Sequence, residues 1–512
     1  MNDCLLAIDV GTTAAKVSLY GLDGGLLAAA AERYAPVRPR DGWCEQDPEV
    51  WWRSVCVAAA RCMREAPQVR VASVGVSGVM NGVVLVDEHG RSVRPALLHA
   101  DLRSAAQARR LAAQVGLERV RAITGHRPEP YYTSAKLAWL HEVEPDAVRQ
   151  ARWCIQAKDY IRGRLTGAWG QTDPSDASLT GMYDLRAGRW SPDIIASLGI
   201  ADRLLPRVLA SGTISGAVHR EAADALPLPV GTPVAIGAGD GACATVGAGA
   251  VSPGDTYHYL GGTSWIGSLT PAYVPESAPD LSVFSGATPG SHVLYGTVQA
   301  AGSCIDWLLR LAGVGRPTDA DLAELERIAA AAPEGAKGLL FLPYLEGERA
   351  PIWDPSARGA FVGLTASHGR GEVARAVYEG VALALGSVLD RMREAGAEPA
   401  TVRLIGGGAR SVLWRRILAA VYGRPVAVLE RLSEATGAGA AVIAGIAAGL
   451  LEGWGAAGRF APIALVEEPE AELARTYAEM AAIYARLYPA LADTFRALAA
   501  LQRPPAHATQ GQ

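Results

Sequence analysis

Short apolar runs alternate with turn residues over the first thirty positions of the chain. Residues 4–10, 17–21 and 26–31 are largely apolar, and they are separated by Gly-Thr-Thr at 11–13 and by Asp-Gly-Gly at 23–25. Apolar runs of this length between tight-turn residues are typical of strands. The pattern therefore predicts an antiparallel meander of three strands at the N-terminus.

The remainder of the first half combines helical and strand patterns. Trp51, Val55 and Ala58 lie on one face of the segment 48–63 when it is wound as a helix, which predicts an amphipathic helix. The apolar run at 69–78 predicts a buried strand. Helical periodicity also dominates two further segments, 105–124 and 134–152.

Two later segments repeat the theme of strands joined by glycine turns. Residues 233–249 have the pattern of a strand, a run of glycines and a helix of small residues. Residues 256–269 have the pattern of strand, Gly-Gly-Thr turn and strand, which is similar in design to the N-terminal meander. We therefore predict an α/β protein of two lobes, with residues 1–245 in the first lobe, 246–500 in the second and a disordered tail at 501–512.

The second half is predicted to be rich in helices. The uncharged run 435–451 is mostly Ala and Gly and is short for a membrane span, so we predict a buried helix there. A strand with a glycine run is predicted at 401–410. The other predicted helices of this half are 303–312, 319–332, 371–395 and 411–421.

The composition of the 512 residues narrows the class of protein. Half of the residues are hydrophobic, and 48 basic against 52 acidic residues give a net charge of −4. This balance provides no general attraction to nucleic acid or to an anionic membrane, so we predict neither as a partner. Seven scattered cysteines without a C-x-x-C pair, and a start without a basic segment, predict a cytoplasmic protein with reduced thiols.

The first candidate site is the turn at 9–16, Asp-Val-Gly-Thr-Thr-Ala-Ala-Lys. Backbone N–H groups and hydroxyls exposed at such a turn can hold phosphate oxygens, and Asp9 can hold Mg²⁺ through water. Lys16 adds a positive charge. The alternative is a tight turn in which Asp9 only accepts from backbone donors. The sequence lacks the P-loop pattern G-x-x-x-x-G-K-[ST].

The second candidate is the run Gly237–Ala242, which follows a predicted strand. It matches the dinucleotide-binding pattern G-x-G-x-x-A, but the acidic residue expected about 20 positions later is missing. Asp240, at the carboxyl end of the strand, could instead act as a general base for a substrate hydroxyl. As a lone residue it could equally cap the helix that follows.

Further motifs contain glycine turns or paired charges. Gly261–Ser264 is a second Gly-Thr turn, and Gly406–Ser411 leads from a strand to a helix start that could face a phosphate. Asp101 and Arg103 follow the segment 77–82 and, two residues apart on an extended chain, point to the same side. This pair suits a polyhydroxyl ligand, and a surface salt bridge is the alternative.

Taken in chain order, these segments resemble the FGGY family of carbohydrate kinases from Leu5 to about Gly449. The resemblance rests on six motifs: IDVGTTAAK, SGVMNGVVLVDEHG with DLRS, KDYIRGRLTG with TDPSDAS, GAGDGA, LGGTSW and GGGARSVLWRRILA. It implies an α/β fold of two actin-like, ribonuclease H-like lobes with a cleft between them. It also implies a Mg²⁺-dependent enzyme that uses ATP to phosphorylate a sugar.

The resemblance further implies a role for each matched residue. Asp240 would be the base that accepts the proton of the attacking hydroxyl, and Asp9 would lie near Mg²⁺. The sugar-binding residues implied in this way are Met80, Asn81, Asp101, Arg103 and Asp240. The ATP-binding residues are Gly11, Thr12, Thr13, Lys16, Gly262, Thr263, Gly302, Gly407, Gly408 and Ser411.

The sugar-facing motifs depart from those of the family's D-xylulose kinases, which the chain otherwise resembles most. Those kinases usually have Gln-Met-His where this chain has Val79-Met80-Asn81, Asn-Asp where it has Ala100-Asp101, and Gly-Asp-Asn where Gly241 follows Asp240. We predict a ketopentose such as D-xylulose as the substrate, with ribulose, gluconate, erythritol and glycerol as alternatives. A non-catalytic actin-like nucleotide sensor is a further alternative, and a homodimer is compatible with the sequence.

Overall fold

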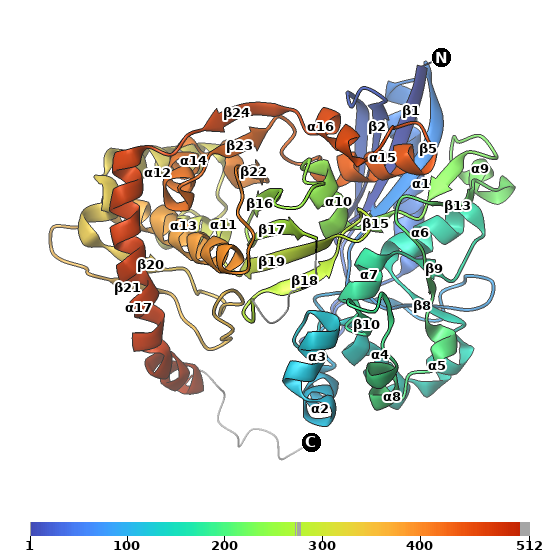
Figure 1. Cartoon of the computed structure of the whole chain (residues 1–512), viewed down its shortest axis with the longest axis horizontal. Helices are drawn as coiled ribbons and strands as arrows, with labels where there is room; N and C mark the ends of the chain where they lie inside the picture. Colours follow the sequence, from blue (N-terminus) through green and yellow to red (C-terminus); the bar gives the residue numbers. More distant parts are fainter. Residues whose placement is uncertain (1, 272, 274–277, 502–512) are drawn as a thin grey trace.

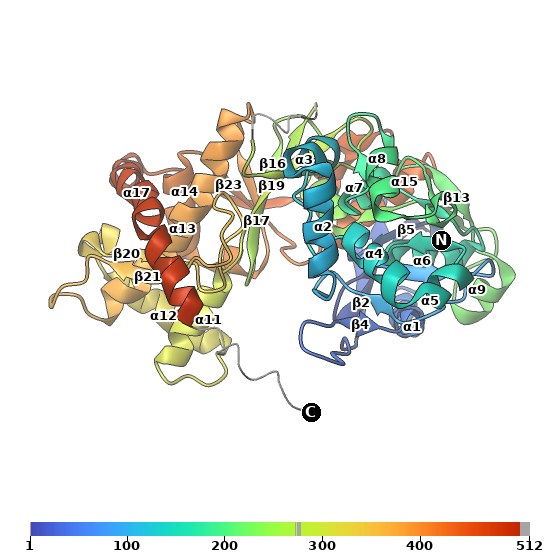
Figure 2. The same ribbon diagram turned by 90° about the horizontal axis from the view of Figure 1, so that it is seen from below.

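A computed structural model describes residues 2–271, 273 and 278–501. The chain forms two lobes, each built around a seven-stranded sheet. In Figure 1 the N-terminal lobe, in blue and green, lies on the right, and the C-terminal lobe, in yellow to red, lies on the left. Figure 2 shows the same separation from below. The predicted α/β architecture of two lobes is confirmed.

The N-terminal sheet has the strand order β13-β14-β5-β1-β2-β3, and β15 also pairs with β5. Strands β1 to β3 form the predicted antiparallel meander, and β1 runs parallel to β5. The register places Asp9 opposite Lys16 across the first turn. The strands are β1 (Asn2–Val10), β2 (Ala14–Gly21), β3 (Leu26–Arg33), β5 (Val69–Gly78), β13 (Ile214–Ala217), β14 (Pro233–Ala235) and β15 (Ala238–Gly239).

Helix α1 (Pro48–Glu65) packs against β2 and β3, where the spacing of its apolar residues predicted a helix. The Asp47 side chain caps the first turn by accepting a hydrogen bond from the Glu49 N–H. Pro48 suits the first helical position because no N–H is needed there. Trp51 is buried in the core of the lobe, so the predicted face is the one that packs inward.

The other helices of this lobe lie mainly at the lower right of Figure 1. The segment predicted as one helix at 105–124 is two helices, because Gly116 interrupts it with a φ of 92°. The helices are α2 (Ala105–Val115), α3 (Leu117–Thr124), α4 (Thr133–Val143), α5 (Pro145–Gln150), α6 (Ala157–Thr166), α7 (Pro174–Leu179), α8 (Pro192–Leu198) and α9 (Arg220–Ala225). Short strand pairs are β4 (Glu45–Gln46) with β7 (Ala96–Leu97), β6 (Val84–Val86) with β8 (Trp153–Ile155), β9 (Gln171–Thr172) with β12 (Arg207–Val208), and β10 (Tyr183–Asp184) with β11 (Arg189–Trp190).

The C-terminal sheet has the order β18-β19-β17-β16-β22-β23-β24. Its strands are β16 (Thr256–Leu260), β17 (Ser264–Thr270), β18 (Ser282–Ser285), β19 (His292–Val298), β22 (Val402–Ile405), β23 (Val426–Leu429) and β24 (Ile463–Glu467). The helices α11 (Gly302–Leu311), α12 (Asp319–Ala331), α13 (Arg370–Glu394) and α14 (Val412–Tyr422), and the pair β20 (Leu340–Leu342) with β21 (Ala360–Val362), complete this part. All four helices lie where the sequence predicts them.

Helices α10 (Asp240–Gly247) and α15 (Ala435–Ala447) form the junction of the lobes. They pack so closely that a Cβ on Gly439 would lie 1.9 Å from the Cys243 O. Helix α15 also packs on β1 and β5, so a helix from the second half of the chain covers the sheet of the first half. The predicted buried helix is confirmed, and its small residues are what allow the close approach.

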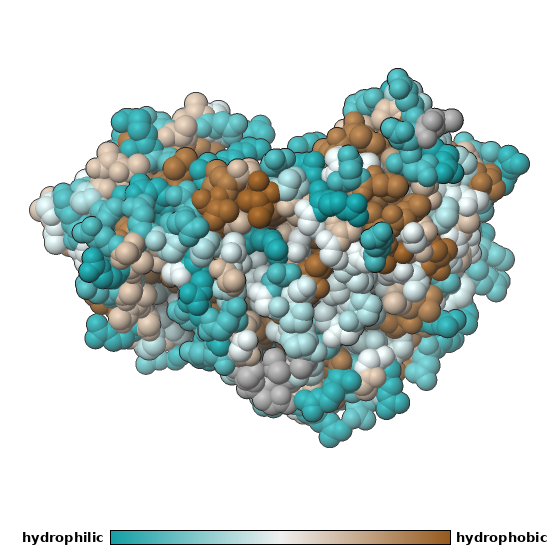
Figure 3. Space-filling model, turned by 45° about the horizontal axis from the view of Figure 1, so that its top comes forward, coloured by the Kyte–Doolittle hydropathy of each residue, from teal (hydrophilic) through white to brown (hydrophobic). Residues whose placement is uncertain are grey.

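Helix α17 (Ala471–Leu501) was not predicted. The prediction of disorder at 501–512 lies outside the described residues apart from Leu501, which ends this helix. Among the described residues, no helix combines the length and apolar character that crossing a membrane requires. On the face shown in Figure 3, polar and apolar side chains are intermixed, and the outline dips between the lobes.

Candidate active site

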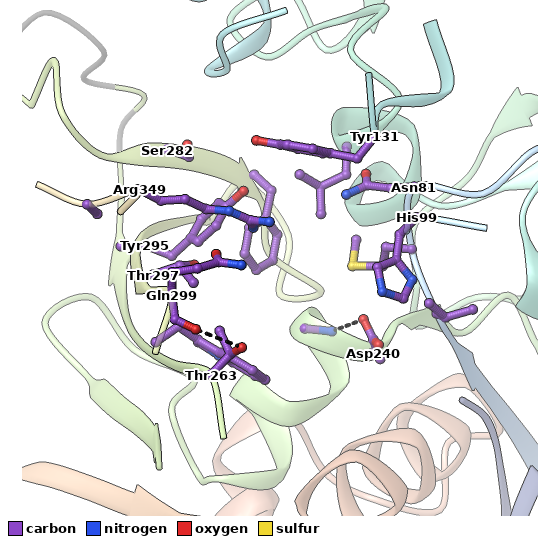
Figure 4. A pocket seen from close by; sticks show the side chains of 18 of the residues that line it. Asn81, His99, Tyr131, Asp240, Thr263, Ser282, Tyr295, Thr297, Gln299 and Arg349 are labelled. Atoms are coloured by element: carbon purple, nitrogen blue, oxygen red, sulfur yellow. Dashed lines mark hydrogen bonds between the residues drawn. The ribbon is translucent and has the colours of Figure 1, made fainter. Parts of the chain in front are cut away.

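A cavity of about 660 Å³ lies between the two lobes. Figure 4 shows labelled side chains on two opposing walls, with Asp240 at the lower right, below His99. The N-terminal lobe provides one wall and the C-terminal lobe the other, so a ligand here would contact both. The labelled side chains are Asn81, His99 and Tyr131 on the first wall, and Thr263, Ser282, Tyr295, Thr297, Gln299 and Arg349 on the second.

A second cavity, of about 320 Å³, adjoins the first. Asp240, Gly241 and Trp265 line both cavities, so the two spaces meet at the start of α10. Lys16, predicted to bind ATP, lines only the second cavity, and Asn81, predicted to bind sugar, lines only the first. Two compartments that share one carboxylate are the arrangement that a group transfer between two ligands requires.

Asp240 is the first residue of α10 and directly follows β15. Gly239, not Asp240, holds the N-cap position, so the helix-capping alternative is wrong. The Gly239 N–H donates to Ser175 Oγ (2.9 Å), and Asp240 Oδ1 accepts from the Gly241 N–H (2.8 Å). Burial, and then the charge of Asp9, raise the pKa of Asp240 from 3.8 to about 7. A carboxylate with this pKa can take up a proton near neutral pH.

Asp9 lies at the end of β1, where the lobes meet. Its Oδ1 is buried and has no hydrogen-bond partner among the described residues. Burial raises the pKa of Asp9 to about 6, although Lys16 opposes this shift. A divalent cation would neutralise such a carboxylate. The described residues include no cluster of three or more His, Cys, Asp or Glu arranged for a metal. Mg²⁺ is commonly bound through one or two carboxylates together with phosphate and water, and the buried Oδ1 of Asp9 suits such a role.

The first predicted phosphate turn joins β1 to β2. Its backbone closes through a hydrogen bond from the Gly11 N–H to the Ala14 O, at 3.0 Å. Thr12 lines the first cavity, whereas Thr13 is exposed. Because Lys16 lines the second cavity, the turn and the strand after it border both spaces.

The second predicted phosphate turn joins β16 to β17, and the start of α11 packs against it. The Gly302 N–H donates to the Gly261 O at 2.8 Å. A Cβ on Gly302 would lie 2.7 Å from the same oxygen, so this contact requires glycine. The space around the Gly262 Cα is open, and Thr263 lines the first cavity. The backbone of this turn is therefore free to approach a ligand.

The second cavity extends to the predicted adenosine motif. Gly407 lines this cavity, and Gly408 packs so tightly that a Cβ on it would lie 2.5 Å from Leu260 Cγ. Ser411 is not among the lining residues, because its hydroxyl accepts from the Trp414 N–H and caps α14. The hydroxyl of Ser411 thus has a helix-capping role, and its predicted contact with ATP stays a prediction.

Aromatic residues that were not predicted form part of the second cavity. Tyr259 and Trp265 stack with their ring centroids 4.1 Å apart, and both line the cavity. Stacked rings of this kind present a flat apolar surface. The motif LGGTSW already contained Trp265, but only the antiparallel pairing of β16 with β17 brings Tyr259 beside it. The remaining wall comes from Leu432, Ser433, Ala435 and Thr436.

Met80 and Asn81, predicted to bind sugar, line the first cavity. Asn81 has a φ of 64°, a left-handed conformation that asparagine tolerates better than most residues. The Asn81 O accepts from Lys136 Nζ at 2.7 Å, and the same ammonium group donates to the Tyr131 O at 2.7 Å. Buried Lys136 therefore holds two segments of the cavity wall together.

Asp101 and Arg103, also predicted to bind sugar, are not among the residues that line the cavity. Asp101 is fully buried, accepts from the Cys44 N–H (2.6 Å) and pairs with Arg103 (2.7 Å). The Arg103 guanidinium also pairs with Glu45 and lies 3.5 Å from the ring centroid of Trp43. The two side chains therefore form a salt bridge within their own lobe, but the pair is buried, whereas the alternative placed it on the surface.

His99 and Gln299 line the first cavity and were not predicted to bind a ligand. His99 Nδ1, Gln299 Oε1 and Asn81 Oδ1 are buried, and none has a partner in the part of the chain that the structure describes. Burial, and then the charges of Lys136 and Arg349, lower the pKa of His99 to about 4, so the ring is neutral and offers one donor and one acceptor. Unpartnered buried polar atoms are rare, and three around one cavity, from both of its walls, indicate a polar ligand.

Arg349 reaches the first cavity from the loop between β20 and β21. Its guanidinium lies 5.0 Å from the ring centroid of Tyr131. The backbone N–H of Arg349 donates a hydrogen bond to the Glu348 side chain. Among the described residues, the Arg349 guanidinium has no ion-pair partner. The C-terminal lobe thus presents a positive charge to this cavity.

The chain matches two family models along most of its length. The model of the N-terminal domain of the FGGY family of carbohydrate kinases covers residues 4–247, and that of the C-terminal domain covers 257–448. The chain is 35% identical to the xylulose kinase of Escherichia coli strain K12, over 86% of this chain and 90% of that protein.

Solved structures agree with these matches. The xylulose kinase from Rhodospirillum rubrum has a TM-score of 0.90 and 31% identity, and the match covers 96% of this chain and 100% of that one. The gluconate kinase from Lactobacillus acidophilus has a TM-score of 0.91 and 26% identity, with coverage of 97% and 100%. The two domain models match in chain order, and the two-lobed fold agrees with them. The chain belongs to the FGGY family of carbohydrate kinases.

Proposed function

We propose that this sugar kinase transfers the γ-phosphoryl group of ATP to a terminal hydroxyl of a ketopentose such as D-xylulose. The observation that carries the proposal is the meeting of two cavities at Asp240. The unpartnered Asn81 Oδ1, His99 Nδ1 and Gln299 Oε1 suit the hydroxyl groups of a polyhydroxylated substrate. The relatives that are named xylulose kinases support a ketopentose as the acceptor.

In this proposal Asp240 accepts the proton of the attacking hydroxyl. The sugar oxygen forms a bond to the γ-phosphorus, the bond from that phosphorus to the bridging oxygen breaks, ADP leaves, and the proton passes to the Asp240 carboxylate. Phosphoryl transfer requires mainly positioning and neutralisation of charge. A carboxylate whose pKa is about 7 is ionised in a large fraction of molecules at neutral pH and still holds the proton effectively.

The turns at Gly11–Thr13 and Gly261–Thr263 would hold the phosphate groups through backbone N–H groups and hydroxyls. Lys16 would add a positive charge on the nucleotide side. Asp9 would hold Mg²⁺, through water, and the ion would neutralise charge on the phosphate oxygens. The unpartnered buried Oδ1 of Asp9 supports this assignment.

We also propose that residues 1–245 form the sugar-binding lobe and residues 246–500 the nucleotide-binding lobe, with the second lobe closing the sugar cavity. The sugar cavity draws Asn81 and His99 from the first part of the chain and Gln299 and Arg349 from the second. Closure of one lobe on the other would therefore complete the sugar site and exclude water, the competing acceptor. The predicted homodimer and cytoplasmic location stay predictions.

The proposal is tested by measuring ADP release from ATP with D-xylulose, ribulose, gluconate, glycerol and erythritol. We expect the highest kcat/KM with a ketopentose. Asp240→Ala should lower kcat by about 10²-fold or more, the range for loss of a general base, while ATP binding survives. Asp224→Ala, which removes an exposed carboxylate on α9, is the matched control and should keep normal turnover. Normal turnover by Asp240→Ala, or no ADP release with any acceptor, would contradict the proposal.

A sugar acid such as gluconate is the second candidate, and Arg349 is the observation that favours it. The Arg349 guanidinium lines the sugar cavity without an ion-pair partner among the described residues. Such a group could bind a carboxylate through a bidentate pair of hydrogen bonds. The similarity to a gluconate kinase structure agrees with this alternative. Arg349→Leu separates the two candidates, because it should raise KM for gluconate far more than KM for a neutral ketose if gluconate is the substrate.

A further inference from the structure

A cluster of buried charges lies behind the loop that carries Asp240. Lys158, Asp159 and Arg162 belong to α6, Asp176 belongs to α7, and Asp173 is the N-cap of α7. All five side chains are at most 1% exposed. None of them lines either of the two cavities that meet at Asp240, so any effect of the cluster on the reaction must act through other residues.

Lys158 is the centre of this cluster. Its Nζ lies 2.6 Å from Asp159 Oδ1, 3.1 Å from Asp173 Oδ1 and 3.1 Å from Asp176 Oδ2. Burial alone would lower the pKa of Lys158, but these three carboxylates raise it, so the ammonium group stays charged. Burial raises the pKa of Asp176 well above its usual range, and the charge of Lys158 opposes this shift.

Asp173 connects the cluster to the catalytic loop through one hydroxyl. Asp173 Oδ2 accepts from Ser175 Oγ at 2.6 Å and from Ser211 Oγ at 2.9 Å. Ser175 Oγ in turn accepts from the Gly239 N–H at 2.9 Å. A hydroxyl is needed here because the same oxygen must donate to a carboxylate and accept from a backbone N–H. Gly239 immediately precedes Asp240.

The loop is held at several points, one of them a hydrogen bond from the Gly237 N–H to the Ser211 O at 3.2 Å. Strand β15 has only two residues, and it pairs with β5 at Ser77–Gly78. Its end at Gly239 is therefore held by this short pairing and by Ser175. A shift of about 1 Å at a reacting group can cost about 10²-fold in rate, so a contact that fixes the residue before Asp240 can influence kcat without touching a ligand.

We propose that Ser175, oriented by Asp173 and Lys158, is a positioning residue that fixes the Asp240 carboxylate for phosphoryl transfer. The proposal rests on the proposed function of Asp240 as the base. The cluster supplies a rigid acceptor in Asp173, the acceptor sets the direction of the Ser175 hydroxyl, and the hydroxyl holds the Gly239 N–H. Loss of the hydroxyl should lower kcat and leave the binding of ATP and of sugar unchanged.

The test compares Ser175→Thr with Ser175→Val. The threonine and valine side chains have nearly the same shape, but only threonine has a hydroxyl. We expect the valine variant to have a kcat at least about tenfold lower than the threonine variant, with both KM values within about twofold of each other. Thr180→Val is the matched control, since it removes a buried hydroxyl just after α7 that bonds only within its own segment, to Ala177 and Met182. The control should keep the kcat of the unmodified enzyme.

A double-mutant cycle tests whether Asp173 acts through Ser175. Asp173→Asn should lower kcat in the unmodified enzyme but cause little further loss when Ser175 is already replaced by valine. Independent, multiplying losses would overturn the proposed connection, as would equal kcat values for S175T and S175V. Thermal unfolding of each variant separates a lower kcat from a lower content of folded enzyme.

Asp240→Asn, measured in the same assay, distinguishes failure of this proposal from failure of the proposed function. If Asp240→Asn keeps its turnover, Asp240 is not the base and the proposed function itself fails. If Asp240→Asn loses its turnover while S175V keeps the kcat of S175T, the base is assigned correctly and the positioning role of Ser175 is refuted.

Discussion

Replacement of Asp240 by asparagine should stabilise the fold while it abolishes turnover. The pKa of Asp240 is raised from 3.8 to about 7, first by burial and then by Asp9. A carboxyl group with a raised pKa in the folded state favours folding when it is protonated, and this contribution is lost as the pH rises from 3.8 through 7. Asparagine cannot ionise, and its Oδ1 can still accept from the Gly241 N–H.

The size of the effect follows from the two pKa values. A difference of one pKa unit corresponds to about 1.4 kcal/mol, so the shift to about 7 gives a stability difference of at most about 4 kcal/mol at pH 8. At pH 5 the same two values give about 2 kcal/mol, because Asp240 is then mostly protonated in the folded protein. The advantage of Asp240→Asn should therefore grow by roughly 2 kcal/mol between pH 5 and pH 8.

The assay is urea-induced unfolding at both pH values in the presence of EDTA, because a bound cation would lower the pKa of nearby carboxyl groups. Asp224→Asn on the surface of α9 serves as the control and should show no gain that depends on pH. An advantage of Asp240→Asn that is the same at pH 5 and pH 8, or a variant less stable than the unmodified protein at pH 8, would refute the reasoning.

Three further substitutions test individual walls of the site. Lys16→Met should raise KM for ATP about tenfold or more through loss of a charged contact. Lys337→Met is the control and should change KM for ATP little, because the Lys337 ammonium pairs with Glu372. Initial rates at varied ATP measure both variants. Gly302→Ala should raise KM for ATP about tenfold, because its Cβ would lie 2.7 Å from the Gly261 O and displace the turn; a normal KM would show that the turn can yield. His99→Phe should raise KM for the sugar about fivefold and leave KM for ATP unchanged. Initial rates at varied sugar and at varied ATP measure the two KM values, and an equal change in both would mean that the ring acts only in packing.

The elements that the sequence predicts well are those whose signals are local. The meander, the glycine turns and Asp240 each combine a short apolar run with turn residues in one segment, and the structure contains each of these elements. The 31-residue helix α17 was not predicted, since only a few of its side chains are buried and Pro489 interrupts its pattern. Its packing partners lie far away along the chain.

Residues that depend on distant partners were placed less well by the sequence. Nothing in the spacing of Asp101 and Arg103 reveals that the Cys44 N–H and the ring of Trp43 occupy their side chains. His99 stands two positions before Asp101, but only the fold shows that its ring, and not the acidic side chain, borders the cavity. A local pattern can therefore identify a segment of the site without identifying which side chain of that segment contacts the ligand.

The structure also shows where the departures from the xylulose kinase motifs lie in the sugar cavity. Those kinases usually have an imidazole at the position of Asn81 and an amide at the position of Ala100, whereas this chain has an amide at 81 and an imidazole at 99. Asn81 and His99 line the same cavity, and each has an unpartnered buried polar atom. Those kinases also usually have amides at the positions of Val79 and Gly241, and this chain has none there. The departures therefore lower the number of side-chain hydrogen-bonding groups as well as moving them, so the choice among polyhydroxylated substrates depends on which hydroxyl groups Asn81 and His99 can reach.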